Sequence, residues 1–270
     1  MKKNDLVLLA LKSLILEVSL YPKPGLVDPM DSGSHDDMDY NMFLESCFAL
    51  VPGFEAYFDA GLNHRGTLPE LFEVIRNVGI ENEKAMFHAT ENVNTHKGAN
   101  FLYGVVIAAI AFMNMPNLKT LREGIQAMTS GLVDAELKSL TVYKTHGERM
   151  FCDYGFTGIR GEVEAGIPHV FEVALPMLDS DNDKLVARKK ALLALMQSNN
   201  DTNMLKRGGI EGLEFGKSRA HSSYQDLDEH LIQMNYEFIE RNLSPGGTAD
   251  LLALSIFIQM YRDQRLKDAD

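Results

Sequence analysis

Apolar residues recur along most of the chain at spacings of three and four, and the alternating pattern typical of strands is almost absent. This spacing predicts an all-α protein. The expected helices cover residues 5–20, 40–60, 68–91, 97–114, 117–141, 161–178, 183–198, 201–217, 225–242 and 247–265. No repeat, low-complexity run or Pro/Ser linker divides them, so we expect a single compact multi-helix domain over residues 1–270.

The charge balance argues against nucleic acid as a partner. The chain carries 26 Lys and Arg residues against 38 Asp and Glu residues, which gives a formal net charge of −12. This excess of negative charge repels phosphodiester backbones at long range. With 45% apolar and 24% charged residues, the composition is still that of a globular protein able to bury a core.

Cysteine usage and hydropathy predict a cytoplasmic protein with no membrane partner. Cys47 and Cys152 are far apart and belong to no Cys/His cluster, which is typical of a reducing compartment. The apolar N-terminal run is interrupted by Lys12 and Glu17 and has no small-residue cleavage site, so we interpret it as an amphipathic helix. The apolar stretch 101–115 is too short to span a bilayer.

The first joint between predicted helices combines a restrained lysine with several carboxylates. Two flanking prolines stiffen the backbone around Lys23, which lowers the entropy lost when its ammonium group binds a phosphate. Asp36, Asp37 and Asp39 offer three carboxylates beside His35, which suit a hard cation with oxygen ligands. A solvated turn and negative charge at a helix N-terminus are the structural alternatives.

The joint before the apolar helix at 97–114 has the residues of an anion site. His96, Lys97 and Gly98 would bring a neutral donor, a cation and unpaired backbone N–H groups to one point. An N-cap formed by a neighbouring Asn or Thr is the alternative, but it leaves the His-Lys pair unexplained.

The long central joint, residues 142–161, holds a third polar cluster. His146 precedes Arg160, which stands between two glycines and has room to approach a planar phosphate or carboxylate. Glu162 has the chemistry to ligate a metal, to act as a base or to pair with Arg160. A surface Arg–Glu ion pair is the ordinary alternative.

The joint after the predicted helix at 183–198 mixes acidic, amide, cationic and glycine residues. Its members are Asp201, Asn203, Lys206, Arg207, Gly208 and Gly209. Helix capping would explain the aspartate and one glycine, but it does not explain the two adjacent cations.

The last joint reads Ser244-Pro-Gly-Gly and leads directly into an apolar helix. Gly246 and Gly247 would expose backbone N–H groups at a helix start, which makes a cradle for phosphate oxygens. The spacing of a P-loop and the dinucleotide fingerprint GxGxxG are both absent from the sequence. The usual α/β nucleotide folds are therefore not supported.

Six motifs occur in series: Pro22-Lys-Pro-Gly-Leu-Val-Asp28, Gly33-Ser-His with Asp37-Met-Asp39, Asn94-Thr-His-Lys-Gly98, Gly158 with Arg160-Gly-Glu162, Asp201-Thr-Asn203 with Arg207-Gly-Gly209, and Ser244-Pro-Gly-Gly with Ala249-Asp-Leu-Leu-Ala253. Together they closely resemble the triphosphoribosyl-dephospho-coenzyme A synthase family, over nearly the whole chain. The resemblance implies an all-α enzyme that joins ATP to 3′-dephospho-CoA, releases adenine and forms 2′-(5″-triphosphoribosyl)-3′-dephospho-CoA.

The same resemblance implies a place for the product. It is the precursor of the prosthetic group of citrate lyase, and a transferase would load it onto the carrier protein. A sister branch carries out the same reaction for malonate decarboxylase. The sequence is compatible with a homo-oligomer and does not decide this point.

The implied reaction displaces adenine from C1 of the ATP ribose by the 2′-hydroxyl of dephospho-CoA, with Mg²⁺ accompanying ATP. Residue type suggests catalytic roles for Asp37, His96, His146, Glu162 and Asp201. Substrate-binding roles fall to Lys23, Lys97, Arg160, Asn203, Arg207, Gly208, Gly209, Ser244, Gly246 and Gly247. The candidate metal ligands are Asp37, Asp39, Asp201 and Asp250.

Two departures from the family pattern and three alternative functions stay open. Asn200 stands where a second Asp is common, and Lys206 stands where His is common. The adjacent His35 and Asp36 would also suit an HD-type phosphohydrolase, and Asn200-Asp-Thr202 would suit a Mg²⁺-dependent ADP-ribosyl hydrolase. A helical scaffold without activity would reduce all these polar joints to caps.

Overall fold

The computed structural model describes residues 1–139 and 146–268, and of His146 the backbone only. Its α-helices are α1 (Lys3–Val18), α2 (Tyr40–Ala49), α3 (Val51–Asn63), α4 (Leu68–Ala89), α5 (Lys97–Phe112), α6 (Leu118–Met128), α7 (His146–Tyr154), α8 (Gly158–Glu164), α9 (Leu175–Leu178), α10 (Lys184–Ser198), α11 (Thr202–His221), α12 (Leu227–Glu240) and α13 (Gly246–Lys267). Two π-helical segments are η1 (Asp134–Lys138) and η2 (His169–Ala174). No strand occurs among the described residues, so the predicted all-α class is confirmed.

Proline and left-handed residues explain where the predicted helices are divided. The segment 40–60 forms two helices because Pro52 has no N–H to continue the first one. The segment 161–178 is interrupted at Gly166 and Ile167, whose φ angles of 76° and 52° are not helical. The expectation that residues 142–161 lack a helix is wrong for α7.

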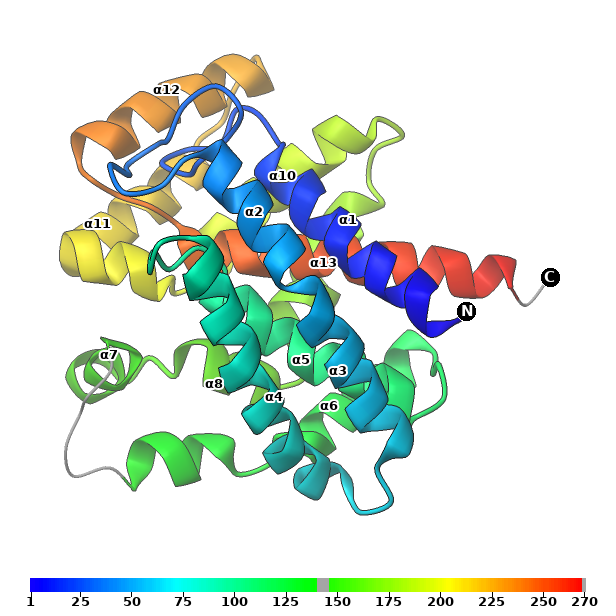
Figure 1. The fold of residues 1–270 in the computed structure, drawn as a ribbon. Coiled ribbons are helices and arrows are strands. Elements are labelled where there is room, and N and C mark those ends of the chain that lie inside the picture. Colours follow the sequence, from blue (N-terminus) through cyan, green and yellow to red (C-terminus); the bar gives the residue numbers. More distant parts are fainter. Residues whose placement is uncertain (140–145, 269–270) are drawn as a thin grey trace.

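Two buried helices, α5 and α13, form the centre of the molecule (Figure 1). All residues from 102 to 111 of α5 and from 251 to 259 of α13 are buried, which explains why these segments are apolar on every face. The buried apolar side chains from α1 to α13 form one continuous core. Even so, none of the described helices combines the length and the apolar character that a membrane span needs.

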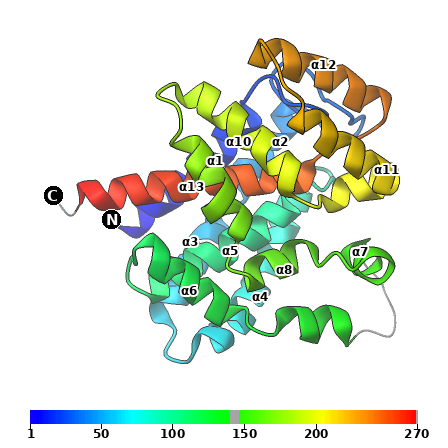
Figure 2. The same cartoon turned by 180° about the vertical axis from the view of Figure 1, so that it is seen from behind.

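The outer helices pack closely on this pair. α3 approaches α5 so tightly that a Cβ on Gly61 would overlap the carbonyl oxygen of Ala108. α1 packs along α13, and the amino group of Met1 lies 2.8 Å from Oδ2 of Asp268, which brings the two ends of the chain together (Figures 1 and 2).

The loop between α1 and α2 is held against α12 and the link that follows it (Figure 1). The N–H of Gly25 donates to Oδ1 of Asn235 at 2.8 Å, and the Ser34 hydroxyl donates to the carbonyl oxygen of Leu243 at 2.6 Å. Gly25 has a φ of 67°, and a Cβ there would overlap the same carbonyl oxygen, so only glycine fits. This anchoring positions His35 next to the start of α13.

Candidate active site

The first turns of α5, α11 and α13 meet at one place, which we call the helix-start junction (residues 98–99, 201–203 and 246–250). The carboxylate of Asp250 lies against Gly98, where a Cβ would overlap it, and accepts a hydrogen bond from the N–H of Ala99. Asp201, the N-cap of α11, contacts the first turn of α13. Three segments that are far apart in sequence therefore direct their helix N-termini to the same point.

Asp201 joins α11 to α13 through both of its carboxylate oxygens. Oδ1 accepts from the N–H groups of Asn203 and Met204 at 2.8 and 3.3 Å. Oδ2 accepts from the N–H and the hydroxyl of Thr248 at 2.7 and 2.9 Å. The side chain is buried, and burial raises its pKa despite these four donors.

Two backbone N–H groups at the start of α13 have no acceptor among the described residues. They belong to Gly246 and Gly247, which precede the first intrahelical bond, from the N–H of Ala249 to the carbonyl oxygen of Pro245. A Cβ on Gly246 would lie 2.8 Å from Nδ2 of Asn203, so glycine permits this close packing. Together with the dipoles of the three helices, these donors favour a bound anion.

Asp250 is the carboxylate that this junction leaves least satisfied. Burial, together with the nearby charges of Glu17 and Asp201, raises the pKa of Asp250 well above its usual range. A carboxylate of this kind holds a proton more readily than an exposed one, which suits a residue that accepts or donates a proton during a reaction.

A buried ion pair lies close to Asp250. Nζ of Lys23 is 2.6 Å from Oε1 of Glu17, and both side chains are buried. Lys23 is therefore neutralised inside the protein rather than presented to solvent. Glu17 was not singled out from the sequence, although it occupies a core-facing position in the apolar periodicity of α1.

His96 is buried at the start of α5. Its Nδ1 lies 2.7 Å from the Ser46 hydroxyl, while its Nε2 has no hydrogen-bond partner among the described residues. Burial, with the neighbouring charge of Lys23, lowers the pKa of His96 to about 3. The imidazole is therefore neutral in the folded protein.

Arg207, His35 and Ser244 form a hydrogen-bonded chain that leads to the start of α13. The Arg207 guanidinium donates to the carbonyl oxygen of Ser34 and to Oδ1 of Asn242, both at 2.6 Å, and its NH2 lies 3.0 Å from Nδ1 of His35. Nε2 of His35 lies 2.8 Å from the Ser244 hydroxyl. Burial and the charge of Arg207 lower the pKa of His35. This shift favours the neutral imidazole, so His35 does not place a second positive charge beside Arg207.

Glu162 belongs to a small polar pocket beside the junction. Its Oε2 lies 2.6 Å from Nδ1 of His169, and its Oε1 accepts from the N–H of the same residue at 2.9 Å. Sequence reasoning missed His169 because an unbroken helix over 161–178 would place it two turns, or about 10.5 Å, from Glu162, whereas the break at Gly166 and Ile167 brings the two side chains together. The two residues line a pocket of about 260 Å³.

Other predicted substrate-binding residues lie outside the junction or have partners of their own. Lys97 is largely exposed and pairs with Glu83 at 2.6 Å, and Arg160 pairs with Glu136 at 2.7 Å. Gly208 and Gly209 lie at a kink inside α11, where Gly209 has a φ of 63°. The side chain of His146 lies outside the described residues.

The four predicted metal ligands do not converge. Asp37 is exposed and lies 3.7 Å from His35, and Asp39 caps α2 by accepting from the N–H of Met42 at 2.8 Å. Of the two that lie at the junction, Asp201 already accepts four hydrogen bonds, so Asp250 keeps the larger free acceptor capacity. Across residues 1–139 and 146–268, no group of three or more His, Cys, Asp or Glu side chains could hold a metal ion. A site with three protein ligands is therefore not formed by these residues, whereas Mg²⁺ bound together with a triphosphate needs only one or two carboxylates.

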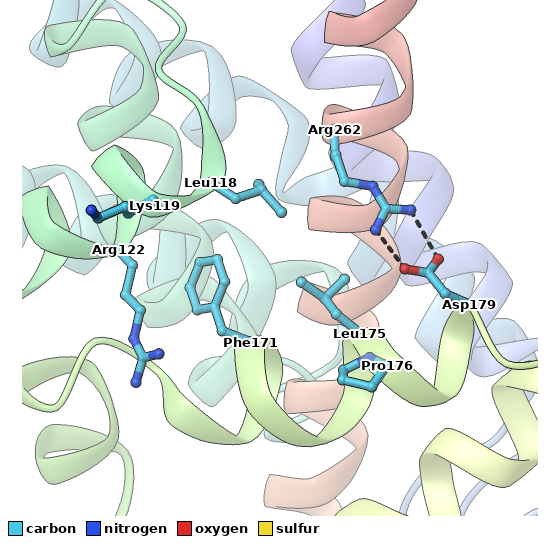
Figure 3. Close-up of a pocket in the computed structure, with 8 residues that line it drawn as sticks. All are labelled: Leu118, Lys119, Arg122, Phe171, Leu175, Pro176, Asp179 and Arg262. Atoms are coloured by element: carbon cyan, nitrogen blue, oxygen red, sulfur yellow. Dashed lines mark hydrogen bonds and ion pairs between the residues drawn. The ribbon is translucent and has the colours of Figure 1, made fainter.

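A larger groove of about 430 Å³ lies elsewhere, among α6, η2, α9 and α13 (Figure 3). Three of its charged groups already have partners: Arg262 binds Asp179 at 2.6 and 2.9 Å, and Arg122 pairs with Glu172. Arg262 is 16 residues along α13 from Gly246, or about 24 Å at the rise of an α-helix. None of the predicted site residues lines this groove.

The protein is therefore all-α, and helix N-termini, glycines and buried carboxylates lie together at one site in its fold. A family model described as ATP:dephospho-CoA triphosphoribosyl transferase matches residues 3–268. The chain therefore belongs to this family of transferases, whose reaction uses ATP and dephospho-CoA as substrates. The hydrolase and scaffold alternatives are not favoured.

Curated relatives agree over nearly the full length. The 2-(5″-triphosphoribosyl)-3′-dephosphocoenzyme-A synthase of Pectobacterium atrosepticum is 40% identical over 260 residues, which cover 92% of this chain and 86% of the relative. Proteins of Streptococcus equi subsp. equi and Lactiplantibacillus plantarum, both named as probable synthases of the same kind, are 39% identical. They cover 97% and 94% of this chain and 98% and 96% of their own lengths.

The double contact of Asp201 predicts a stability effect. In Asp201→Asn the amide oxygen still caps α11, but the amide NH₂ faces the N–H of Thr248, which loses its acceptor. We expect the free energy of unfolding to fall by about 1–3 kcal/mol in urea denaturation. Asp39→Asn is the matched control, because Asp39 is an exposed N-cap and Asn caps as well as Asp. Equal losses in the two variants would contradict the bridging role.

The buried neutral state of His96 predicts a pH effect. The unfolded chain gains a proton on His96 as the pH falls below 6.5, whereas the folded protein does not do so until about pH 3. Stability is therefore lost as the pH is lowered through this window. We expect the wild type to lose about 2 kcal/mol more than His96→Asn between pH 7.5 and 5. Urea denaturation at each pH measures this, and parallel curves for the two proteins would refute it.

Proposed function

We propose that the helix-start junction binds the triphosphate of ATP. The observation that carries this proposal is the convergence of three helix N-termini around Gly246 and Gly247, whose N–H groups lack acceptors among the described residues. Such donors stabilise an anion without the cost of burying a lysine or arginine. Asn203, packed against Gly246, adds an amide donor to the same place.

The predicted cations act at the rim of this site. Arg207 is already oriented by Ser34 and Asn242, which lowers the entropy lost when it contacts a phosphate. Lys97 and Arg160 would exchange their present carboxylate partners for phosphate oxygens. Mg²⁺ accompanies the triphosphate as its counterion, as ATP commonly requires.

Asp250 is the residue that we assign to the transfer step. The bond between C1 of the ribose and adenine breaks with its electron pair passing to adenine, and a new bond forms between C1 and the 2′-oxygen of dephospho-CoA. The hydroxyl proton passes to Asp250, whose raised pKa makes it a stronger base than an ordinary aspartate, and the departing adenine takes up a proton from solvent, so that it leaves as the neutral base. His96 is neutral and buried at the start of α5, and its Nε2 has no partner among the described residues. It contributes a hydrogen bond to the substrate through this atom and adds no charge.

The product is used in the cytoplasm to modify a carrier protein. The triphosphoribosyl product is the precursor of the citrate lyase prosthetic group, which a separate transferase attaches to the carrier protein. Both cysteines are free, which agrees with a reducing compartment.

The reaction itself is tested by product analysis. We expect incubation with ATP, Mg²⁺ and dephospho-CoA to release adenine in a one-to-one ratio with a triphosphoribosylated product, and to release none when dephospho-CoA is omitted. Liquid chromatography with mass spectrometry measures both products. Formation of ADP, AMP or phosphate without adenine would overturn the assignment.

The role of Asp250 predicts a loss of turnover without a loss of stability. We expect Asp250→Asn to lower kcat by about a hundredfold or more and to remove the acidic limb of the pH–rate profile. Because burial makes the Asp250 charge unfavourable, the neutral amide should leave the melting temperature unchanged or raise it. Asp226→Asn, at the exposed N-cap of α12, is the control and should keep wild-type activity. Near-normal turnover of Asp250→Asn would exclude the base role.

A further inference from the structure

The polar pocket beside the junction has the chemistry of a base-binding site. It lies between the α7–α8 link, the start of η2 and the α10–α11 joint, and its side chains include Phe156, Glu162, His169, Asn199 and Asn200. In the view from behind, α7 and α8 lie below α11 and the start of α13 (Figure 2).

Glu162 presents a fixed hydrogen-bond acceptor to this pocket. His169 holds each carboxylate oxygen once, through Nδ1 at 2.6 Å and through its backbone N–H at 2.9 Å. A carboxylate has about four acceptor positions, so about two stay available. The hydrogen bond to Glu162 raises the pKa of His169, although burial and the nearby Lys217 act in the opposite direction. A carboxylate accepts hydrogen bonds and cannot donate them.

Asn200 supplies the opposite function. Its Oδ1 accepts from Nζ of Lys217 at 2.5 Å, which leaves the amide NH₂ to donate to a ligand. The ring of Phe156, another wall of the pocket, offers a surface on which a flat base can stack. A fixed acceptor, a donor and an aromatic ring are thus gathered in one small volume.

We propose that this pocket holds an adenine ring of a substrate. Adenine carries a 6-amino donor beside ring-nitrogen acceptors, which matches a carboxylate beside an amide NH₂. A 6-oxo purine would place its carbonyl oxygen against the carboxylate and be rejected. The proposal rests on the proposed function, because both ATP and dephospho-CoA contain adenine.

The pocket adjoins the helix-start junction. A Cβ on Gly158, which lines the pocket, would lie 3.3 Å from Cγ2 of Thr202 at the start of α11. Nδ2 of Asn199 donates to the hydroxyl of Thr248 in the first turn of α13 at 3.1 Å. A nucleotide whose phosphates occupy the junction can therefore reach the pocket with its base.

The test is a change of base preference. We measure kcat/KM for base release from ATP and from inosine triphosphate, in which a carbonyl oxygen replaces the 6-amino group. The wild type should prefer ATP by about a hundredfold or more. Glu162→Gln should narrow this preference by about tenfold or more, because the Gln amide can donate to the 6-oxo group. If Glu162→Gln turns over too slowly, Kd values for ATP and inosine triphosphate are measured by calorimetry without dephospho-CoA. The ratio of these Kd values then replaces the ratio of kcat/KM values.

Glu164→Gln is the matched control on the same helix. Glu164 also accepts from two backbone N–H groups, those of Gly131 and Val133 at 2.7 and 3.0 Å, but it does not line the pocket. We expect its ATP preference to equal that of the wild type.

A second series separates the two sources of adenine. ATP is kept constant while dephospho-CoA is compared with its deaminated analogue, which carries hypoxanthine. If Glu162→Gln narrows only the preference for ATP over inosine triphosphate, the adenine of ATP lies in the pocket. If it narrows only the preference for dephospho-CoA over its deaminated analogue, the adenine of dephospho-CoA lies there. Unchanged preferences in both series would overturn the adenine pocket. Absence of any adenine release from ATP by the wild type would instead refute the proposed function.

Discussion

The carboxylate of Asp201 is the interaction on which the arrangement of the site depends. It accepts two hydrogen bonds from the first turn of α11 and two from Thr248 of α13. Helix starts normally leave their N–H groups to be satisfied by caps or water. Because one buried side chain satisfies two helices, their N-termini are held together, and the neighbouring N–H groups of Gly246 and Gly247 remain available to an anion.

Burial of acidic groups is the electrostatic cost of this arrangement. Glu17, Asp201 and Asp250 all lie near the centre, and burial raises the pKa of each one. Lys23 supplies the countercharge at 2.6 Å from Glu17. A lysine that resembles a phosphate ligand in the sequence thus has an internal role, since an unpaired buried carboxylate would be strongly unfavourable. The site then uses backbone dipoles more than side-chain cations to attract a polyphosphate.

The two parts of the proposed site, the helix-start junction and the adenine pocket, are built from different kinds of structural element. The junction is built from the starts of long helices that belong to the core, so its geometry is set by helix packing. The adenine pocket is built from short segments around α8 and η2, where left-handed residues such as Gly158 and Ile167 interrupt regular structure. Phosphates and base would therefore be bound by separate structural units, which meet where Asn199 contacts Thr248.

The sequence by itself determined the all-α class, most helix positions and the family, because apolar periodicity and motif order are local properties of the chain. It also identified Asp201, Gly246 and Gly247 as residues of interest. Only the tertiary structure decided that Asp250 lies against Gly98, that Asp37 and Asp39 stay at the surface, and that His169 meets Glu162. These outcomes depend on how distant helices pack, and a polar residue in a joint has the same local pattern whether it caps a helix or lines a site.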